Sequence, residues 1–229
     1  MRCALLHGFA GSPAAWDDVI AGWQHGSEPM AIALPGHGGG PVRASWDANL
    51  DAVARAIADC DLVVGYSLGA RVALGLVATG RAPRAVLIGV NPGIADAERA
   101  ARRASDAAWG RMLRERGIDA FADAWAAQPL FASQARVPRE RLAARRSCRV
   151  ALDPEQLARS LEVMGVAEMP DYCDAIAADR VALVAGADDA KYVAIARRFS
   201  VGFETIPDCG HDPTLEQPRA LATVITRLA

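Results

Sequence analysis

The sequence predicts an α/β fold in which a mostly parallel sheet is flanked by helices. Short apolar runs without polar alternation, such as Leu62–Val64 and Val181–Ala185, are typical of strands that are buried on both faces. Helical patterns and glycine-containing turns follow these runs in alternation along the chain. Hydrophobic residues make up 52% and charged residues 23% of the 229 residues. This composition suits one folded domain with a sizeable core and excludes a disordered chain.

The first part of the chain contains four expected strands and three expected helices. The strands are Arg2–Leu6, Met30–Leu34, Leu62–Val64 and Ala85–Val90. The helices run from Ser12 to about Gly22, from Asp47 to Asp59 and from Leu68 to Val77. Pro13 suits a first helical turn, because its missing N–H would have no partner there. Leu50, Val53 and Ile57 recur at helical spacing.

Residues 94–170 interrupt this alternation with helical patterns alone. We therefore expect a helical lid at 94–170, inserted between a first core segment, 1–93, and a second core segment, 171–229. The second segment should contain the strands Val181–Ala185 and Phe203–Ile206, a helix from about Val193 and a last helix from Leu215 to Leu228. The chain is thus predicted to be one α/β domain that carries a lid.

The composition also excludes several classes of protein. No segment approaches the roughly 20 apolar residues that a membrane-spanning helix needs, and the residues before Gly8 are too few for a secretory signal. The five cysteines are scattered and lack metal-ligand spacing, which argues against a disulfide scaffold or a structural zinc. We expect a cytoplasmic protein, a monomer or weak homo-oligomer, that uses no metal, organic cofactor or membrane.

The charge distribution points to an anionic ligand. The formal net charge is −2, but the segment from Glu98 to Arg149 holds twelve arginines against six acidic residues. A basic insert in an acidic frame favours an anionic ligand, although solvated helix faces would give the same pattern. Nucleic-acid binding is not expected, because the arginines alternate with acids and no recognised reading module is present.

The motif Gly65-Tyr66-Ser67-Leu68-Gly69 carries the clearest chemical signal. It fits G-x-S-x-G and lies between an expected strand and an expected helix. In that setting the serine occupies a sharp turn, and the small residues let strand and helix approach each other. The hydroxyl then projects beyond the carboxyl end of the sheet, where open α/β folds bind ligands. Ser67 is the predicted catalytic hydroxyl.

A catalytic serine needs a base, and the base needs an orienting carboxylate. In folds with this motif the acid and then the histidine follow the serine, and His211 is the only histidine after Ser67. The acid should follow the strand Val181–Ala185, where Asp188 and Asp189 compete. The common spacing G-x-x-D favours Asp189, and Asp188 would then cap the next helix.

An oxyanion hole is expected to complete this site. The residue after the serine, Leu68, offers one backbone N–H, and Phe9, in the loop after the first strand, offers the second. Two fixed donors in a dry site stabilise a developing negative charge without having to reorganise. We interpret His7 and His37 as structural loop histidines.

Further sequence segments carry a resemblance to known proteins. They are the continuation of the elbow through Ala70-Arg71, Asn91-Pro92-Gly93-Ile94, Glu98-Arg99-Ala100-Ala101-Arg102-Arg103, the lid segment from Phe121 to Phe131, Arg146-Ser147 and Asp189-Ala190-Lys191-Tyr192. With these segments the chain resembles the α/β-hydrolase superfamily. More narrowly, it is similar to the 2-succinyl-6-hydroxy-2,4-cyclohexadiene-1-carboxylate (SHCHC) synthases of menaquinone biosynthesis. The likeness spans nearly the whole chain, the lid included.

The resemblance implies a carbon–oxygen lyase that eliminates pyruvate from a cyclohexene bearing three carboxylates. The Ser67 oxygen, poised by His211 and Asp189, would take the proton, and the N–H groups of Phe9 and Leu68 would hold the resulting oxyanion. By motif position, the implied substrate-binding residues are three arginines and three aromatic residues: Arg71, Arg102 and Arg146, and Tyr66, Trp125 and Phe131. Guanidinium groups suit carboxylates because they bind them at two points.

Other interpretations remain open at this stage. A serine hydrolase (a carboxylesterase, thioesterase or carbon–carbon hydrolase) acting on a small acidic substrate would use the same triad, and a non-catalytic receptor could retain it. Arg71 could cap the sheet edge, and Arg102 and Arg146 could be surface charges of the lid. Trp125 and Phe131 could be lid core.

Overall fold

A single six-stranded sheet forms the centre of the molecule. The computed structural model describes residues 2–24 and 26–228. The strands are β1 (Arg2–Leu6), β2 (Glu28–Ile32), β3 (Leu62–Tyr66), β4 (Ala85–Ile88), β5 (Val181–Gly186) and β6 (Gly202–Ile206). Their order is β2-β1-β3-β4-β5-β6, and every neighbouring pair is parallel. The predicted α/β fold is confirmed, and the sheet of the described residues is parallel throughout.

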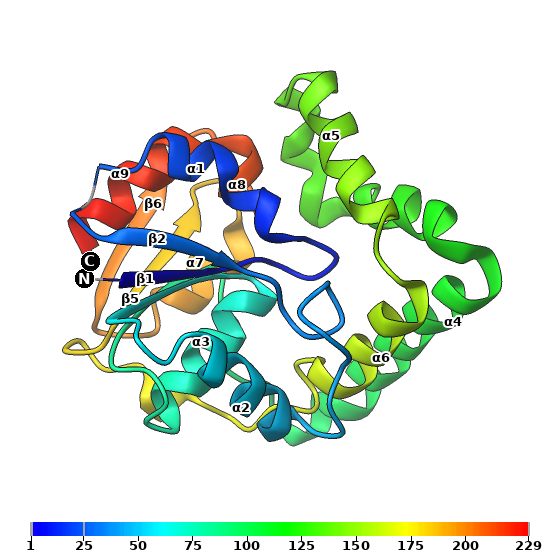
Figure 1. Ribbon diagram of the computed structural model, residues 1–229, viewed down its shortest axis with the longest axis horizontal. Helices are drawn as coiled ribbons and strands as arrows, with labels where there is room; N and C mark the ends of the chain where they lie inside the picture. The colour runs from blue at the N-terminus through cyan, green and yellow to red at the C-terminus, as the bar shows by residue number, and fades with distance from the viewer. Residues whose placement is uncertain (1, 25, 229) are drawn as a thin grey trace.

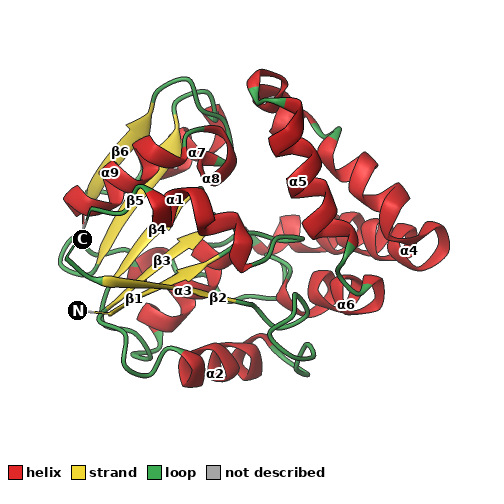
Figure 2. Cartoon of the chain, turned by 45° about the horizontal axis from the view of Figure 1, so that its top comes forward, coloured by secondary structure: helices red, strands yellow, loops and turns green. Residues whose placement is uncertain are grey.

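Helices cover both faces of the sheet (Figures 1 and 2). The helices of the core are η1 (Pro13–Trp16), α1 (Asp17–Ala21), α2 (Trp46–Ala56), α3 (Leu68–Ala78), η3 (Cys173–Ala175), α7 (Ala190–Ala196), α8 (Pro213–Glu216) and α9 (Pro218–Leu228). Side chains of a strand point alternately to opposite faces. Accordingly, Ala4 and Leu6 of β1 pack with α2 and α3, whereas Cys3 and Leu5 pack with α1 and α9. No helix within residues 2–24 and 26–228 has both the length and the apolar character needed to cross a membrane.

The segment between β4 and β5 is helical, as the sequence predicts. It contains α4 (Asp96–Ala126), η2 (Pro129–Arg136), α5 (Arg139–Val150) and α6 (Pro154–Met164), all within the described part of the chain. Figures 1 and 2 show α4, α5 and α6 gathered beyond one end of the sheet. Helix α4 bends at Gly117, whose φ of 76° suits glycine. We call residues 94–170 the lid region.

Several element boundaries differ from the prediction. Strand β2 ends at Ile32, because the carbonyl of Leu34 accepts hydrogen bonds from the N–H groups of His37 and Gly39 and so belongs to a turn. The last helix is divided into α8 and α9 before Pro218, which lacks the N–H that a continuous helix would use. Helix α7 begins directly after Asp189 rather than near Val193.

Candidate active site

Ser67 lies on the sharp turn between β3 and α3. Its φ of 53° and ψ of −107° form a backbone conformation that non-glycine residues rarely adopt. The glycines of the motif make this turn possible by close packing. A Cβ on Gly65 would overlap the carbonyl of Gly69, and a Cβ on Gly69 would overlap the carbonyl of Leu6. The sequence therefore holds β1, β3 and α3 close together and presents the hydroxyl at the carboxyl end of the sheet.

His211 links Ser67 to Asp189. Its Nδ1 lies 2.7 Å from Asp189 Oδ2, and its Nε2 lies 3.2 Å from Ser67 Oγ. The side chains of His211 and Asp189 are only 2% and 5% exposed, so their contact is shielded from water. This is the geometry of a serine whose proton can pass to an imidazole that a carboxylate orients.

Asp188 takes no part in this arrangement. Its carboxylate is exposed and forms an ion pair with Arg136 of the lid region. The expectation that Asp188 caps the next helix is wrong, because Asp189 occupies the N-cap position of α7 and its side chain does not cap the helix. The side chain of Asp189 instead faces His211.

The two predicted oxyanion donors border the same cavity as Ser67. Leu68 is the first residue of α3, so its N–H has no acceptor within the helix. Phe9 follows Gly8, where a Cβ would lie 2.7 Å from the ring of Tyr66 and 3.5 Å from the Cβ of Ser67. Gly8 thus lets the loop pass close to Ser67. The oxyanion role of Phe9 and Leu68 stays a prediction that this placement supports.

His7 and His37 hold the loops beside the site through hydrogen bonds to the backbone. Both rings are buried. Nε2 of His7 accepts a hydrogen bond from the N–H of Leu34 at 3.2 Å, and Nε2 of His37 accepts one from the N–H of Ala10 at 3.1 Å. Burial lowers the pKa of His7 to about 3 and that of His37 to about 4, so both rings are neutral at pH 7. Neither histidine contacts Ser67 among the described residues, and His25 lies outside them.

We expect the free energy of unfolding to decrease as the pH falls from about 6.5 to 4, owing to these two rings. The ordinary histidine pKa is 6.5, so the unfolded chain binds protons in this range whereas the folded chain does not. The stabilisation is complete above pH 6.5 and is lost towards the folded pKa values, by up to about 1.4 kcal/mol per pH unit for each ring. Urea unfolding as a function of pH measures it. His37→Gln should reduce the slope of the free energy of unfolding against pH. An unchanged slope in that variant would contradict the conclusion that the buried His37 ring is neutral in the folded protein.

A cavity of about 370 Å³ lies between Ser67 and the lid region. Of the predicted substrate-binding residues, Arg71, Arg102 and Trp125 line it. Nη1 of Arg71 donates to the carbonyl of Met164 at 2.6 Å. Burial, together with the charge of Arg102, lowers the pKa of Arg71 to about 10, which leaves the guanidinium charged at pH 7. Nε of Arg102 donates to the buried carboxylate of Asp106 at 2.9 Å. Arg71, Arg102 and Lys191 thus line the cavity together with the single carboxylate of Asp106, so the cavity suits an anion.

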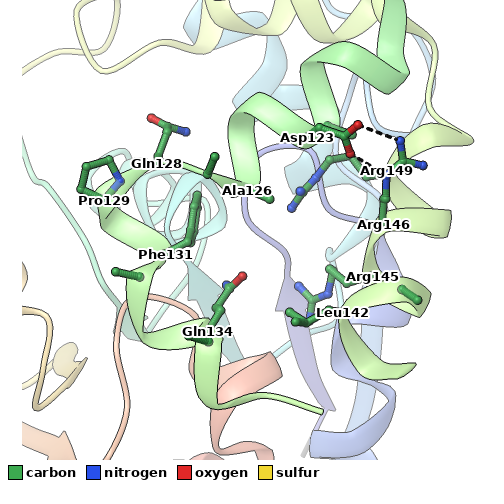
Figure 3. Close-up of a pocket in the computed structure, with 15 residues that line it drawn as sticks. Asp123, Ala126, Gln128, Pro129, Phe131, Gln134, Leu142, Arg145, Arg146 and Arg149 are labelled. Atoms are coloured by element: carbon green, nitrogen blue, oxygen red, sulfur yellow. Dashed lines mark hydrogen bonds and ion pairs between the residues drawn. The ribbon is translucent and has the colours of Figure 1, made fainter. Parts of the chain in front are cut away.

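The other three predicted binding residues do not line this cavity. Tyr66 is buried with its ring centroid 5.5 Å from that of His211. The ring centroid of Phe131 lies 6.1 Å from that of His211, but Phe131 lines a second cavity in the lid region (Figure 3). Arg146 lines this second cavity as well, where it forms ion pairs with Asp119 and Asp123 of α4. Contact of these three residues with substrate stays a prediction.

Among the lining residues of the cavity over Ser67 that the sequence reasoning did not predict, four polar side chains stand out by their contacts or burial. Tyr192 places its ring centroid 4.6 Å from that of His211, and the Lys191 ammonium lies 5.4 Å from the Tyr192 ring. Both residues directly follow Asp189 in the segment Asp189-Ala190-Lys191-Tyr192. Their place next to the predicted acid could therefore have marked them as candidates for the site. Asp106 follows Arg102 by four residues, the spacing of neighbours on a helix. Nothing in the sequence distinguishes Ser160.

The hydroxyl of Ser160 is buried without a hydrogen-bond partner in the part of the chain that the structure describes. An unpaired buried polar group costs about 1–3 kcal/mol. We therefore expect Ser160→Ala to raise the free energy of unfolding by about 1 kcal/mol, measured by urea unfolding. The matched control is Ser45→Ala, because Ser45 Oγ caps α2 by accepting from the N–H of Ala48; this variant should lose about 1 kcal/mol. A loss of stability in Ser160→Ala would show that its hydroxyl is paired.

Helix α5 of the lid region is tied to the loop that follows His211. Nη1 of Arg145 lies 3.0 Å from Asp212 Oδ2, and its Nη2 donates to Thr214 Oγ1 at 3.1 Å. The side chains of Arg145 and Asp212 are 14% and 6% exposed. Asp212 also caps α8 by accepting a hydrogen bond from the N–H of Leu215. The residue next to His211 is thus fixed from both the core and the lid region.

Similar sequences and structures are found among known proteins. The model of the alpha/beta hydrolase family matches residues 4–224. The SHCHC synthase of Enterobacter sp. (strain 638) is 33% identical over 98% of this chain and 90% of its own length, and that of Escherichia coli O139:H28 (strain E24377A / ETEC) is 34% identical over 98% and 91%. The structure of MenH from S. aureus is similar with a TM-score of 0.91 and 26% identity, covering 100% of this chain and 92% of that one. A thermophilic esterase from Thermogutta terrifontis shares the fold with a TM-score of 0.82 at 22% identity, over 99% and 88%. The chain therefore belongs to the alpha/beta hydrolase family and, within it, to the family of the SHCHC synthases.

Proposed function

We propose that this protein eliminates pyruvate from 2-succinyl-5-enolpyruvyl-6-hydroxy-3-cyclohexene-1-carboxylate and forms SHCHC. The observation that carries the proposal is the contact of Ser67 with His211 at the floor of a cavity that also contains Arg71 and Arg102. Identity of about one third to SHCHC synthases along almost the whole chain supports the same substrate. The elimination transfers one proton and shifts electron pairs within the substrate, without net oxidation or reduction. The reaction therefore requires no redox cofactor.

The triad would act by proton abstraction. His211 Nε2 accepts the proton of Ser67, and the serine oxygen removes the proton from the ring carbon next to the succinyl ketone. The electron pair moves onto the ketone oxygen, where the N–H groups of Phe9 and Leu68 stabilise the negative charge. It then shifts through the ring double bond and breaks the carbon–oxygen bond to the enolpyruvyl group. That group leaves as the enolate of pyruvate and takes up a proton, so no covalent enzyme intermediate is formed.

The cations of the cavity would orient the substrate for this proton transfer. Arg71 is fixed by its bond to the Met164 carbonyl, and Arg102 is fixed by Asp106. A guanidinium that is already held in place loses little freedom when it binds a carboxylate, which favours accurate positioning. The unpaired hydroxyl of Ser160 borders the same cavity and offers one further hydrogen bond.

A serine hydrolase acting on a small acidic substrate is the second candidate function. The 3.2 Å contact between Ser67 Oγ and His211 Nε2 would serve attack on an acyl group as well as proton abstraction. A hydrolase would form an acyl-enzyme on Ser67 and would show a burst of the first product. The proposed lyase would show neither.

Release of pyruvate from the enolpyruvyl substrate is the experiment that tests the proposal. Coupling to lactate dehydrogenase follows pyruvate, and mass spectrometry follows SHCHC. Asp189→Asn should lose most of the activity, whereas Asp188→Asn, one residue earlier and outside the triad, should retain it. Rapid cleavage of short acyl esters without pyruvate release would reject the lyase and favour the hydrolase.

The arrangement of helices supports a role for residues 94–170 as a lid over Ser67. Lining groups from α4 and α6 border the cavity opposite the core. A small polyanionic substrate without nucleic acid or membrane remains the expected partner. A cytoplasmic location and a monomeric or weakly associated state likewise stay part of this proposal.

A further inference from the structure

The imidazole of His211 is almost completely enclosed by protein groups. Its side chain is 2% exposed, its Nδ1 contacts Asp189 and its Nε2 contacts Ser67. Gly89 lies against the ring, because a Cβ on this glycine would be 3.0 Å from Cε1 of His211. Proton transfer from Ser67 creates a positive charge on this ring, where water has little access. Neighbouring protein groups must therefore stabilise the imidazolium.

Among the described residues, three aromatic rings lie beside the imidazole of His211. Tyr66 and Phe131 have ring centroids at 5.5 and 6.1 Å from it, with interplanar angles of 54° and 55°. The ring of Tyr192 is nearer, at 4.6 Å, and closer to parallel, at 33°. An aromatic ring is electron-rich on its face and electron-poor at its edge, so a cation is stabilised most when it lies over the face. Of these rings, Tyr192 has the best geometry for stabilising an imidazolium.

Helix α7 supplies both the carboxylate and the aromatic ring that contact His211. Asp189 is the N-cap residue of α7, and Tyr192 lies three residues later, in the first turn. Residues at this spacing are neighbours on a helix surface. Both side chains accordingly face the imidazole, one with an oxygen and the other with a ring. One short helix thus places two different stabilising groups beside the same base.

The Tyr192 ring is uncharged but lies among charged groups. In the described part of the chain these groups are Asp189 and Lys191 of the same segment, Arg71 of α3 and Arg102 of α4. The Lys191 ammonium lies 5.4 Å from the ring centroid. Burial raises the pKa of both phenols that face His211, Tyr66 and Tyr192, so both are neutral at pH 7. Tyr192 therefore acts on the imidazole through the electrons of its face and not through a full charge.

We propose that the ring face of Tyr192 stabilises the imidazolium form of His211 and so makes the triad a stronger base. Tyr192 is thus a positioning residue, which acts on Ser67 through His211. The inference rests on the proposed function, in which His211 takes the proton of Ser67. The positive charge on His211 exists only after this proton transfer. Loss of the ring should therefore lower kcat and leave KM nearly unchanged.

The test removes the ring and then restores it without its hydroxyl. Tyr192→Leu should lower kcat for pyruvate release by about threefold to tenfold and change KM by less than about twofold. The acid limb of its kcat/KM profile should move to lower pH by about 0.5 to 1 pH unit, because an imidazolium without the ring loses its proton more readily. Tyr192→Phe keeps the ring face and should recover the pH profile and most of the turnover.

The matched control is Phe199→Leu. Phe199 lies in the turn after α7 and borders neither cavity. This variant removes an aromatic ring near the end of the same helix, so its pH profile should equal that of wild type. NMR of the free enzyme provides a readout without turnover. The pH at which the His211 imidazole is half protonated should be lower in Tyr192→Leu than in wild type, by the same amount as the acid limb.

Three results of the kinetic assays would overturn the inference. An equal shift of the acid limb in Tyr192→Phe and Tyr192→Leu would assign the effect to the hydroxyl. A fall in kcat without any shift would mean that the ring only packs against the imidazole. A shift in Phe199→Leu would mean that the pH profile responds to any loss of packing around α7.

NMR also separates this inference from the proposed function. Absence of pyruvate release by the wild type would reject the function, and the titration of His211 would still test the role of Tyr192. Half protonation at the same pH in wild type and Tyr192→Leu would reject the inference alone.

Discussion

Replacing Ser67 by alanine is expected to reduce pyruvate release by at least about 10³-fold. The substitution removes the oxygen that takes the ring proton and leaves His211 and Asp189 in place. The cavity and both of its arginines are untouched, so the Kd of the substrate should change by less than about threefold. Steady-state turnover measures the first effect, and calorimetry measures the second.

A stability measurement on the Ser67→Ala variant controls for loss of activity through unfolding. Alanine can occupy the turn at φ of 53° with about the same strain as serine, so the midpoint of urea unfolding should be close to that of wild type. A variant that folds normally and keeps more than about a tenth of the turnover would contradict a role of Ser67 as the base.

Replacing Arg71 is the change with the second largest expected effect. Arg71→Ala should lower kcat/KM by at least about 10²-fold, because a charge-assisted carboxylate contact and the anchor to Met164 are lost together. Arg71→Lys keeps the charge but lacks the planar fork, and it should recover only part of the activity. The measurement is kcat/KM for pyruvate release.

The matched control is Arg81→Lys, in the turn after α3. Arg81 pairs with Asp47 and Asp51 of α2 and borders neither cavity. This variant should keep the activity of wild type. Full activity in Arg71→Lys would show that the substrate requires only a positive charge at this position and no two-point contact.

The arrangement of Ser67, His211 and Asp189 could be predicted from sequence because local rules fix its geometry. The glycines at 65 and 69 are required by the backbone contacts around Ser67. In a parallel sheet, loops that follow neighbouring strands end at the same edge, so Asp189 after β5 and His211 after β6 had to lie near that serine.

The anion-binding part of the site was less accessible to sequence reasoning. Arg145 and Arg146 are adjacent arginines of α5, and residue type alone does not predict their partners. The packing of α5 brings Asp119 and Asp123 of α4 to Arg146, and Asp212 of the core to Arg145. Likewise, Ser160 became distinguishable only when its hydroxyl proved to be buried without a partner among the described residues.

The ion pair between Arg145 and Asp212 connects α5 of the lid region to the loop that contains His211. If α5 swings outward, it must either leave the carboxylate of Asp212 enclosed without its counter-charge or pull the adjoining loop along with it. His211 lies next to Asp212 in that loop. A movement of α5 away from the core would therefore act directly on the position of the imidazole.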